Sequence, residues 1–332
     1  MKFVIDQAIP FIKGVLEPYA EVLYRRGEAI CAEDVRDADA LIVRTRTRCD
    51  RGLLEGSRVK FIATATIGFD HIDLDYCREL GIEVTTAAGC NARGVLQWVG
   101  AVLALLAEER RFSPDKCTLG IVGVGNVGRL VKEYAEAWGF RVICCDPPRE
   151  EREHCGFIAL DELLCQADIV TFHVPLDATT RHMLNRDSIA LLRNNALVIN
   201  ASRGEVIDTE ALLERDDLTC AIDVWEHEPQ IDRRLLQRAL ITTPHIAGYS
   251  AEGKANATAL SVRAVARHFG LPLGEWYPSS ITPATPNAIE WAEMCRTIAH
   301  YCDLSTESET LKNCPEKFEA LRNNYNYRNE YF

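Results

Sequence analysis

Short apolar runs and longer amphipathic or turn-rich stretches alternate along most of the chain. In the first third, apolar runs predict strands over residues 2–6, 40–45, 61–66 and 82–86. Further along, similar runs predict strands over residues 119–122, 141–145, 169–173, 197–200, 219–223 and 240–242. Apolar strands that alternate with helices are typical of parallel sheets covered on both faces. The pattern therefore predicts an α/β fold with two Rossmann-like, doubly wound parallel-sheet domains and a small helical C-terminal segment.

Two long helices are predicted besides these strands. The longest apolar segment, residues 95–107, is too short to span a bilayer, so we expect a buried helix over residues 93–109. A second helix is expected over residues 251–268, where it would return to the first domain and make that domain discontinuous. Asp187 and Asp208 are predicted to cap shorter helices.

A glycine-rich loop lies between an apolar run and a helical stretch, in Gly123-Val-Gly125-Asn-Val-Gly128. In a dinucleotide-binding loop of this kind, Gly123 permits the tight turn, Gly125 lets the backbone approach a pyrophosphate, and Gly128 lets the helix pack closely. The free N–H groups of the helix N-terminus, which includes Asn126 and Val127, favour a phosphate there. The alternative is a tight turn that binds no ligand.

The next apolar run ends in Asp146, eighteen positions after Gly128. A carboxylate at this place accepts hydrogen bonds from the adenosine ribose and repels a 2′-phosphate. We therefore expect NAD and not NADP as the cofactor. Arg149, three residues further on, is the one nearby feature that would favour a 2′-phosphate.

Composition narrows the choice of partners. The chain has 332 residues and a net charge of −12, which argues against nonspecific binding to nucleic acid or to an anionic membrane. Asp6 interrupts the first apolar run, so we do not expect a signal peptide. The thirteen cysteines include no CxxC pair and are interpreted as structural thiols of a cytoplasmic protein, with no metal site.

Three polar loops follow predicted strands, at residues 198–204, 221–229 and 243–249. Open α/β sheets bind their ligands at these strand ends. Arg203 could pair with a substrate carboxylate, His245 could act as a base, and Glu228 could orient the imidazole. Asp223 could lie at the nicotinamide side of the cofactor. Each residue alone has a simpler explanation, as a surface ion pair, a turn residue or a loop histidine, but together they favour oxidation of a 2-hydroxy acid.

Residues 1 to about 270 resemble the D-isomer-specific 2-hydroxyacid dehydrogenases. The segments that carry the resemblance are ADALIVRT (38–45), TATIGFDH (64–71), AGCNA (88–92), GVGNVG (123–128), CDPPR (145–149) and PHIAGYSAEGK (244–254). AGCNA and CDPPR favour a branch of the family whose 2-hydroxy acid substrate carries a phosphate.

The resemblance implies a role for each matching residue. Arg203, Glu228 and His245 would be catalytic. Asp146, Asp223 and Gly248 would contact NAD, as would the backbone of Val174, which stands where the family usually has Thr. Thr45, Thr66 and Tyr249 would contact the substrate.

The resemblance also implies three parts and a homodimer. Residues 1–92 with 251–280 would form a substrate-binding lid domain, and residues 93–250 the NAD-binding domain. Residues 281–332 would form a shortened dimerisation segment. Independently of the resemblance, the Pro and Ser residues of positions 271–286 indicate a linker, which leads to a predicted helical tail over residues 287–332.

Three arginines alternate at a predicted strand end, Arg44, Arg46 and Arg48 in VRTRTR. If the strand is regular, their side chains share one face and could meet a phosphate, with Arg44 favoured as the ligand. Lys254 is a second candidate. The alternative is a solvated basic edge that discourages strand pairing.

Two other functions stay open at this point. One is a different dehydrogenase of the same family, of the phosphoglycerate or hydroxypyruvate type. The other is a regulatory protein that senses NAD without catalysis. The joint presence of Arg203, Glu228 and His245 favours an enzyme.

Overall fold

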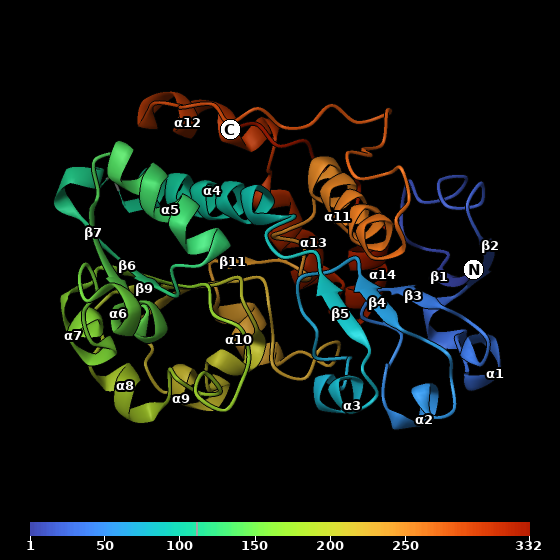
Figure 1. The fold of residues 1–332 in the computed structure, drawn as a ribbon. Coiled ribbons are helices and arrows are strands. Elements are labelled where there is room, and N and C mark those ends of the chain that lie inside the picture. Colours follow the sequence, from blue (N-terminus) through green and yellow to red (C-terminus); the bar gives the residue numbers. More distant parts are fainter. Residues whose placement is uncertain (111) are drawn as a thin grey trace. The chain divides into compact units, whose positions relative to one another are not determined.

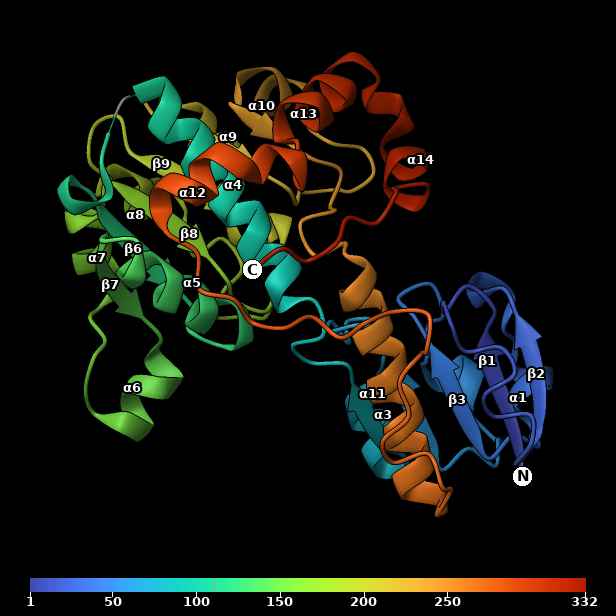
Figure 2. The ribbon, with the colours of Figure 1, turned by 90° about the horizontal axis from the view of Figure 1, so that it is seen from above.

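The computed structural model describes residues 1–110 and 112–332, which form two compact units (Figures 1 and 2). Unit 1 comprises Met1–Asn91 and Ala251–Pro283, and unit 2 comprises Ala92–Ser250 and Ala284–Phe332. Each unit is built on one parallel sheet with helices on its faces. The predicted fold class, two doubly wound α/β domains, is confirmed.

The sheet of unit 1 has five strands in the order β2-β1-β3-β4-β5. These are β1 (Lys2–Asp6), β2 (Glu21–Arg25), β3 (Ala40–Val43), β4 (Phe61–Thr64) and β5 (Glu83–Thr86). Strand β2 was not predicted, because its half-exposed residues at the sheet edge give no clear apolar run. Strands β3 and β4 end two residues earlier than predicted.

Helices cover both faces of this sheet (Figure 1). They are α1 (Ala32–Val35), α2 (Arg51–Leu54), α3 (Leu74–Glu79) and α11 (Ala251–Phe269), with a short 3-10 turn at Gly27–Ala29. Phe61 of β4 lies in one core with Val262 of α11, whereas its neighbour Ile62 lies in another with Leu54 of α2. The predicted return of the helix after residue 250 to the first sheet is therefore correct.

The sheet of unit 2 has six parallel strands in the order β11-β10-β9-β8-β6-β7. They are β6 (Thr118–Val122), β7 (Arg141–Cys145), β8 (Ile169–Phe172), β9 (Leu197–Asn200), β10 (Thr219–Ile222) and β11 (Ile241–Thr242). From β6 the chain goes first to one neighbour, β7, and then to the other, β8. Such a reversal of strand order creates a crevice at the carboxyl ends of the two strands.

Helices pack on both faces of this second sheet as well. Along one face lie α4 (Ala92–Arg110) and α5 (Asn126–Ala137), and along the other α7 (Leu160–Gln166), α8 (Arg186–Ala190), α9 (Thr209–Leu213) and α10 (Arg233–Arg238). The chain also forms α6 (Pro147–Glu153) and 3-10 turns at Pro114–Lys116 and Gly204–Val206. None of the described helices combines the length and the hydropathy needed to cross a bilayer.

Two predicted helix caps have different outcomes. Asp208 caps α9, since its carboxylate accepts the N–H of Ala211. Asp187 does not cap α8 and instead lies in its first turn. The side chain of Asn185 accepts the N–H groups of Asp187 and Ser188, so the cap stands two residues earlier than predicted.

The C-terminal residues of unit 2 are only partly helical. They form α12 (Trp291–Thr297), α13 (Leu304–Asn313) and α14 (Phe318–Asn323), with 3-10 turns at Ile298–His300 and Pro315–Lys317. The predicted helix over the whole tail is wrong at residues 287–290, at residues 302–303 and from residue 324 onward. In the last of these stretches the chain is non-helical, because buried contacts of Arg328 and Phe332 outweigh the weak helix propensity of the Asn- and Tyr-rich sequence.

Candidate active site

Two glycines of the loop after β6 are required by packing. Gly123 has a φ of 86°, and a Cβ added to it would lie 2.6 Å from the carbonyl oxygen of His173. A Cβ on Gly128 would lie 2.0 Å from the carbonyl oxygen of Gly123. The first contact keeps the loop against the end of β8, and the second keeps α5 against the turn.

Gly125 differs, because no described atom lies within 4 Å of the Cβ position beyond its chain neighbours. Protein packing therefore does not explain a glycine here, and the space is open to a ligand. Gly125 is also the N-cap residue of α5, and no described side chain caps that helix. Asn126 and Val127 begin the helix, where N–H groups favour a phosphate. These residues fit the pyrophosphate of a dinucleotide.

A carboxylate stands beside this loop at the end of β7. Asp146 accepts the N–H of Val124 at 2.8 Å through Oδ2 and the N–H of Arg149 at 3.0 Å through Oδ1. The Arg149 side chain donates to Glu153 and, at 2.8 Å, to the carbonyl of Val124. Because the Glu153 carboxylate already pairs with Arg149, this arginine is less available to a 2′-phosphate. The interpretation of Asp146 as a contact of the adenosine ribose is strengthened accordingly.

The end of β8 lies directly against the glycine loop. A Cβ on Gly123 would meet the Val174 side chain at 2.7 Å, so the backbone of Val174 is next to the turn. The neighbouring His173 ring contacts the hydroxyl of Thr171 at 3.0 Å. Burial lowers the pKa of His173 to about 3, so this ring is neutral and is no candidate for the base.

His245 and Glu228 form a hydrogen-bonded pair in unit 2. Nδ1 of His245 lies 2.8 Å from Oε2 of Glu228, and Oε1 of Glu228 accepts the N–H of Trp225 at 3.0 Å. Burial raises the pKa of the Glu228 carboxyl, but the charges of His245 and Arg322 outweigh it and hold that pKa below its usual range. With Nδ1 engaged, Nε2 of His245 is the ring nitrogen that can exchange a proton with a substrate.

Asp223, at the end of β10, holds the loop that carries His245. Its carboxylate is 1% exposed and accepts the Thr243 hydroxyl at 2.6 Å. It also accepts the N–H groups of Ile246 at 2.7 Å and Ala247 at 3.0 Å. Burial raises the pKa of Asp223, although His245 and these hydrogen bonds oppose the shift. The contact with the nicotinamide side that the sequence predicts would come in addition to this structural role.

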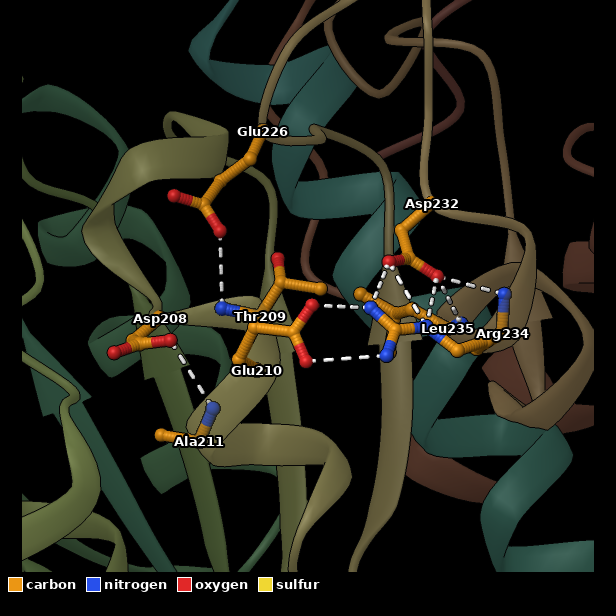
Figure 3. Close-up of polar contacts among 8 residues, drawn as sticks. All are labelled: Asp208, Thr209, Glu210, Ala211, Glu226, Asp232, Arg234 and Leu235. Atoms are coloured by element: carbon orange, nitrogen blue, oxygen red, sulfur yellow. Dashed lines mark hydrogen bonds and ion pairs between the residues drawn. The ribbon is translucent and has the colours of Figure 1, made fainter.

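The loop that carries Glu228 is fixed at its base by neighbouring helices (Figure 3). Glu226 accepts the N–H of Thr209 at 3.0 Å, at the first residue of α9. Asp232 caps α10 by accepting the N–H of Arg234 at 2.7 Å, and the Arg234 side chain pairs with Glu210. These contacts hold residues 226–232 between two helices and so limit the freedom of Glu228.

Arg203 follows β9 and is placed by the glycine after it. A Cβ on Gly204 would lie 2.0 Å from the carbonyl carbon of Trp225, so only glycine allows this approach. The Asn200 side chain donates to the Arg203 carbonyl at 2.9 Å, and the Arg203 side chain donates to the Ser202 carbonyl at 2.7 Å. The backbone next to Arg203 therefore touches the loop that leads to Glu228.

Tyr249 follows Gly248 in the same loop as His245. Its hydroxyl accepts a hydrogen bond from Nε of Arg322 at 3.2 Å. The rings of Tyr325 and Tyr327 lie 6.2 and 6.0 Å from the Tyr249 ring, each edge to face. Sequence analysis gave Arg322 no role in the site, because it lies in the segment that the resemblance assigns to dimerisation.

The other predicted substrate residues belong to unit 1. The Thr66 hydroxyl contacts the Thr64 hydroxyl at 2.7 Å and the Gly68 carbonyl at 3.1 Å. Nε2 of His71 lies 3.2 Å from the same Thr64 hydroxyl. Thr45 is exposed in the turn after β3.

The predicted strand of alternating arginines is wrong, because β3 ends at Val43. Nε of Arg44 pairs at 3.0 Å with Asp6, whose side chain is fully buried at the end of β1. Arg48 pairs with Asp50 at 3.2 Å. A hydrogen bond of 2.9 Å from the Thr47 hydroxyl to the Gly27 carbonyl helps to bend the chain. The second cationic candidate, Lys254, lies on α11.

Comparison with known proteins gives the family. Residues 104–247 match the model of the D-isomer specific 2-hydroxyacid dehydrogenase NAD binding domain. The chain is 47% identical to an erythronate-4-phosphate dehydrogenase of Bacteroides thetaiotaomicron, over 99% of this chain and 97% of that protein. The chain belongs to the D-isomer-specific 2-hydroxyacid dehydrogenase family. An enzyme of the same name from Ectopseudomonas mendocina is 41% identical over 90% of this chain and 83% of that protein.

Solved structures of the family agree. An NAD⁺-bound 3-phosphoglycerate dehydrogenase of Entamoeba histolytica has a TM-score of 0.70 and 27% identity over 81% of this chain and 95% of that chain. A D-lactate dehydrogenase of Aquifex aeolicus, complexed with NAD and lactic acid, has a TM-score of 0.67 and 27% identity over 81% of this chain and 96% of that chain. This member of the dehydrogenase family is an NAD-dependent enzyme, as the sequence predicts.

Proposed function

We propose that this enzyme oxidises 4-phospho-D-erythronate to (R)-3-hydroxy-2-oxo-4-phosphobutanoate with NAD⁺, in the biosynthesis of pyridoxal 5′-phosphate. The observation that carries the chemistry is the 2.8 Å pair of His245 and Glu228 in the unit that holds the dinucleotide loop. The choice of substrate is supported by the erythronate-4-phosphate dehydrogenases that are similar over nearly the whole chain. We further propose that it works in the cytoplasm as a homodimer, with residues 281–332 contributing to the dimer.

His245 is the proposed acid–base group. Nε2 takes the proton of the C2 hydroxyl, while the Glu228 carboxylate holds Nδ1 and stabilises the imidazolium that forms. When bound, NAD⁺ supplies the acceptor for the hydride that leaves C2. The Arg203 guanidinium binds the substrate carboxylate through two parallel hydrogen bonds and orients C2. The C2–O bond becomes a carbonyl as the O–H and C–H bonds break.

Cofactor contacts are assigned to the glycine loop and the neighbouring strand ends. Gly123, Gly125, Asn126, Val127 and Gly128 would hold the pyrophosphate. The remaining proposed contacts with NAD are those of Asp146, Val174, Asp223 and Gly248.

The substrate phosphate is assigned to polar groups that the resemblance and the charge pattern single out. Thr45 and Thr66 would contribute hydroxyl hydrogen bonds to it, and Arg44 would add a positive charge. Tyr249 is proposed as a further contact of the substrate. Arg44 already neutralises Asp6, so it can serve a phosphate only while it keeps that ion pair.

A panel of 2-hydroxy acids assayed with NAD⁺ tests the substrate. 4-Phospho-D-erythronate should give the highest kcat/KM, above 3-phosphoglycerate, D-glycerate and D-lactate. A higher value with 3-phosphoglycerate would assign the chain to another branch of the family. NAD binding without NADH formation on any compound would favour a sensor.

Replacing Asp146 with alanine should weaken NAD binding and reduce the preference for NAD over NADP, because a ribose acceptor and a repelling charge are lost together. Loss of one hydrogen bond to a charged group is worth about tenfold to a hundredfold in affinity. Steady-state kinetics with both cofactors measure the change.

The Asp146→Asn variant removes the charge while its amide oxygen still accepts one of the two backbone N–H groups that Asp146 binds. It should relax the cofactor preference while the loop stays intact. An exposed aspartate on α7, changed in Asp161→Ala, should have no effect. If Asp146→Ala leaves the NAD:NADP ratio of kcat/KM unaltered, Asp146 does not read the ribose.

Replacing Arg44 with alanine should raise KM for the phosphorylated substrate roughly tenfold or more, and much less for a 2-hydroxy acid without phosphate. The reason is the loss of a cation that pairs with the phosphate. Because Arg44 also neutralises buried Asp6, the variant is compared with the double variant Arg44→Ala/Asp6→Asn, which removes the unpaired charge. If KM rises equally for both substrates in the double variant, Arg44 serves the fold and does not bind the phosphate.

A further inference from the structure

The last residues of unit 2 contact the loops that carry the proposed catalytic groups. Arg322 of α14 lies beside the Glu228 loop and the Tyr249 loop. Further on, Ser250 and Arg328 form an isolated parallel bridge, and the Ser250 hydroxyl donates to Glu330 at 2.7 Å. The tail is thus part of the surroundings of the site within its own unit.

The Arg322 guanidinium reaches two functional groups at once. Nη1 lies 3.5 Å from Oε2 of Glu228, the oxygen that also contacts Nδ1 of His245 at 2.8 Å. Nε donates to the Tyr249 hydroxyl at 3.2 Å. The side chains of Arg322 and Glu228 are only 24% and 19% exposed, so solvent screens this ion pair less than a surface pair.

Other residues of the C-terminal segment contact the loop that carries His245 and Tyr249. Tyr325 and Tyr327 place their ring edges against Tyr249. Arg328 is 8% exposed and donates to the Ile246 carbonyl at 3.1 Å, to the Gly94 carbonyl at 2.8 Å and to the Ala247 carbonyl. The backbone of Ile246 and Ala247 therefore lies between Asp223, which accepts the N–H groups of both residues, and Arg328, which donates to the carbonyls of both.

We propose that Arg322 is a positioning residue of the dehydrogenase: one side chain from the C-terminal segment fixes both the Glu228 carboxylate that holds His245 and the hydroxyl of Tyr249. This inference rests on the proposed roles of His245, Glu228 and Tyr249. It adds a link between proton transfer and substrate binding that neither loop provides alone.

The chemistry of arginine suits this position. Its guanidinium is planar and permanently charged, so Nε and Nη1 present donors at a fixed separation to two different acceptors. Its positive charge also helps to hold the pKa of Glu228 below the usual range against burial, together with His245. The other groups that act on this pair are the Trp225 N–H and, behind the loop, the Asp223 carboxylate. A lysine would keep the charge but not the two fixed contacts.

The test compares Arg322→Gln, Arg322→Lys and the control Arg296→Gln, which changes an exposed arginine of α12. Arg322→Gln should lower kcat roughly tenfold to a hundredfold, and it should raise KM because the contact with the Tyr249 hydroxyl is lost. It should also move the ascending limb of the pH profile of kcat/KM by about half a unit to one unit upward. Removing a positive charge makes the Glu228–His245 pair bind its proton more tightly. Arg322→Lys should return the limb near its wild-type position while KM stays raised.

A second measurement does not depend on turnover. The pH at which the Glu228–His245 pair takes up its proton is followed through the His245 ring signals by NMR, in the wild type and in each variant that gives a wild-type-like spectrum. An upward shift in Arg322→Gln, absent in Arg296→Gln, supports the proposal. If neither the titration nor the pH profile moves in Arg322→Gln, or if Arg322→Lys behaves as the glutamine variant does in every measurement, the proposal is wrong.

The proposed function and the proposed role of Arg322 can be contradicted independently of each other. A wild type that does not oxidise 4-phospho-D-erythronate contradicts the proposed function, but the ring titration still decides the role of Arg322. If Arg322→Gln does not fold, Arg322→Lys carries the test, because a KM unchanged from wild type in that variant contradicts the need for two fixed contacts.

Discussion

Replacing His245 with asparagine is expected to lower kcat by roughly a hundredfold to ten-thousandfold and to leave NAD affinity unchanged. The variant loses the group that takes the hydroxyl proton, a contribution of this size in general acid–base catalysis. His245 has a φ of 59°, and asparagine adopts this left-handed region more readily than most residues, so the loop should keep its shape. Steady-state kinetics and a fluorescence titration with NADH measure the two effects.

His300→Asn is the matched control, because His300 is exposed on a 3-10 turn of the C-terminal segment. It should behave as the wild type does. Near-wild-type turnover of His245→Asn would show that another group takes the proton. A parallel loss of NAD affinity would show that the loop, and not the proton transfer, was damaged.

The second large effect is expected for Arg328→Met, which should lower the free energy of unfolding by about 3–5 kcal/mol. This buried arginine donates to three carbonyl groups, of Gly94, Ile246 and Ala247. Methionine fills a similar volume but leaves these acceptors unpaired and removes one of the cations that act on buried Asp223. Urea and thermal unfolding followed by circular dichroism measure the loss, which corresponds to a fall in Tm of roughly ten degrees.

The same variant should lose activity at temperatures at which it is still folded, because the loop after His245 is freed on one side. Arg296→Met, on the exposed side of α12, is the control for removing an arginine from the segment. A change of less than about 1 kcal/mol in Arg328→Met would mean that water replaces the guanidinium without penalty.

The candidate site could be predicted from the sequence because its parts are local. Arg203 and His245 each follow an apolar run within a few residues, and a parallel sheet brings such strand ends to one edge. The glycine loop is also recognised locally, from the spacing of its glycines together with the apolar run before it, the helical stretch after it and Asp146. These predictions depend on the period of the sequence and on the topology of the sheet, and both are visible in one chain.

What could not be predicted depends on contacts between residues far apart in the chain. Arg44 turns to Asp6, 38 positions away, and so does not continue a strand. Arg322 contacts Glu228 across 94 positions, and no pattern links the two. Asp223 was predicted only as a cofactor contact, because its hydrogen bonds to a loop more than twenty positions later leave no periodic signal.

Ile246 and Ala247, which are hydrogen-bonded to both Asp223 and Arg328, join the C-terminal tail to the loop of His245. The tail and the loop should therefore open together. A local unfolding event that detaches residues 324–332 would remove the donors to Ile246 and Ala247 at the same moment. The enzyme would then pass through a state with an intact sheet and a bound nucleotide but without an ordered base. Heat inactivation would follow the detachment of the tail and would precede the melting of the domain.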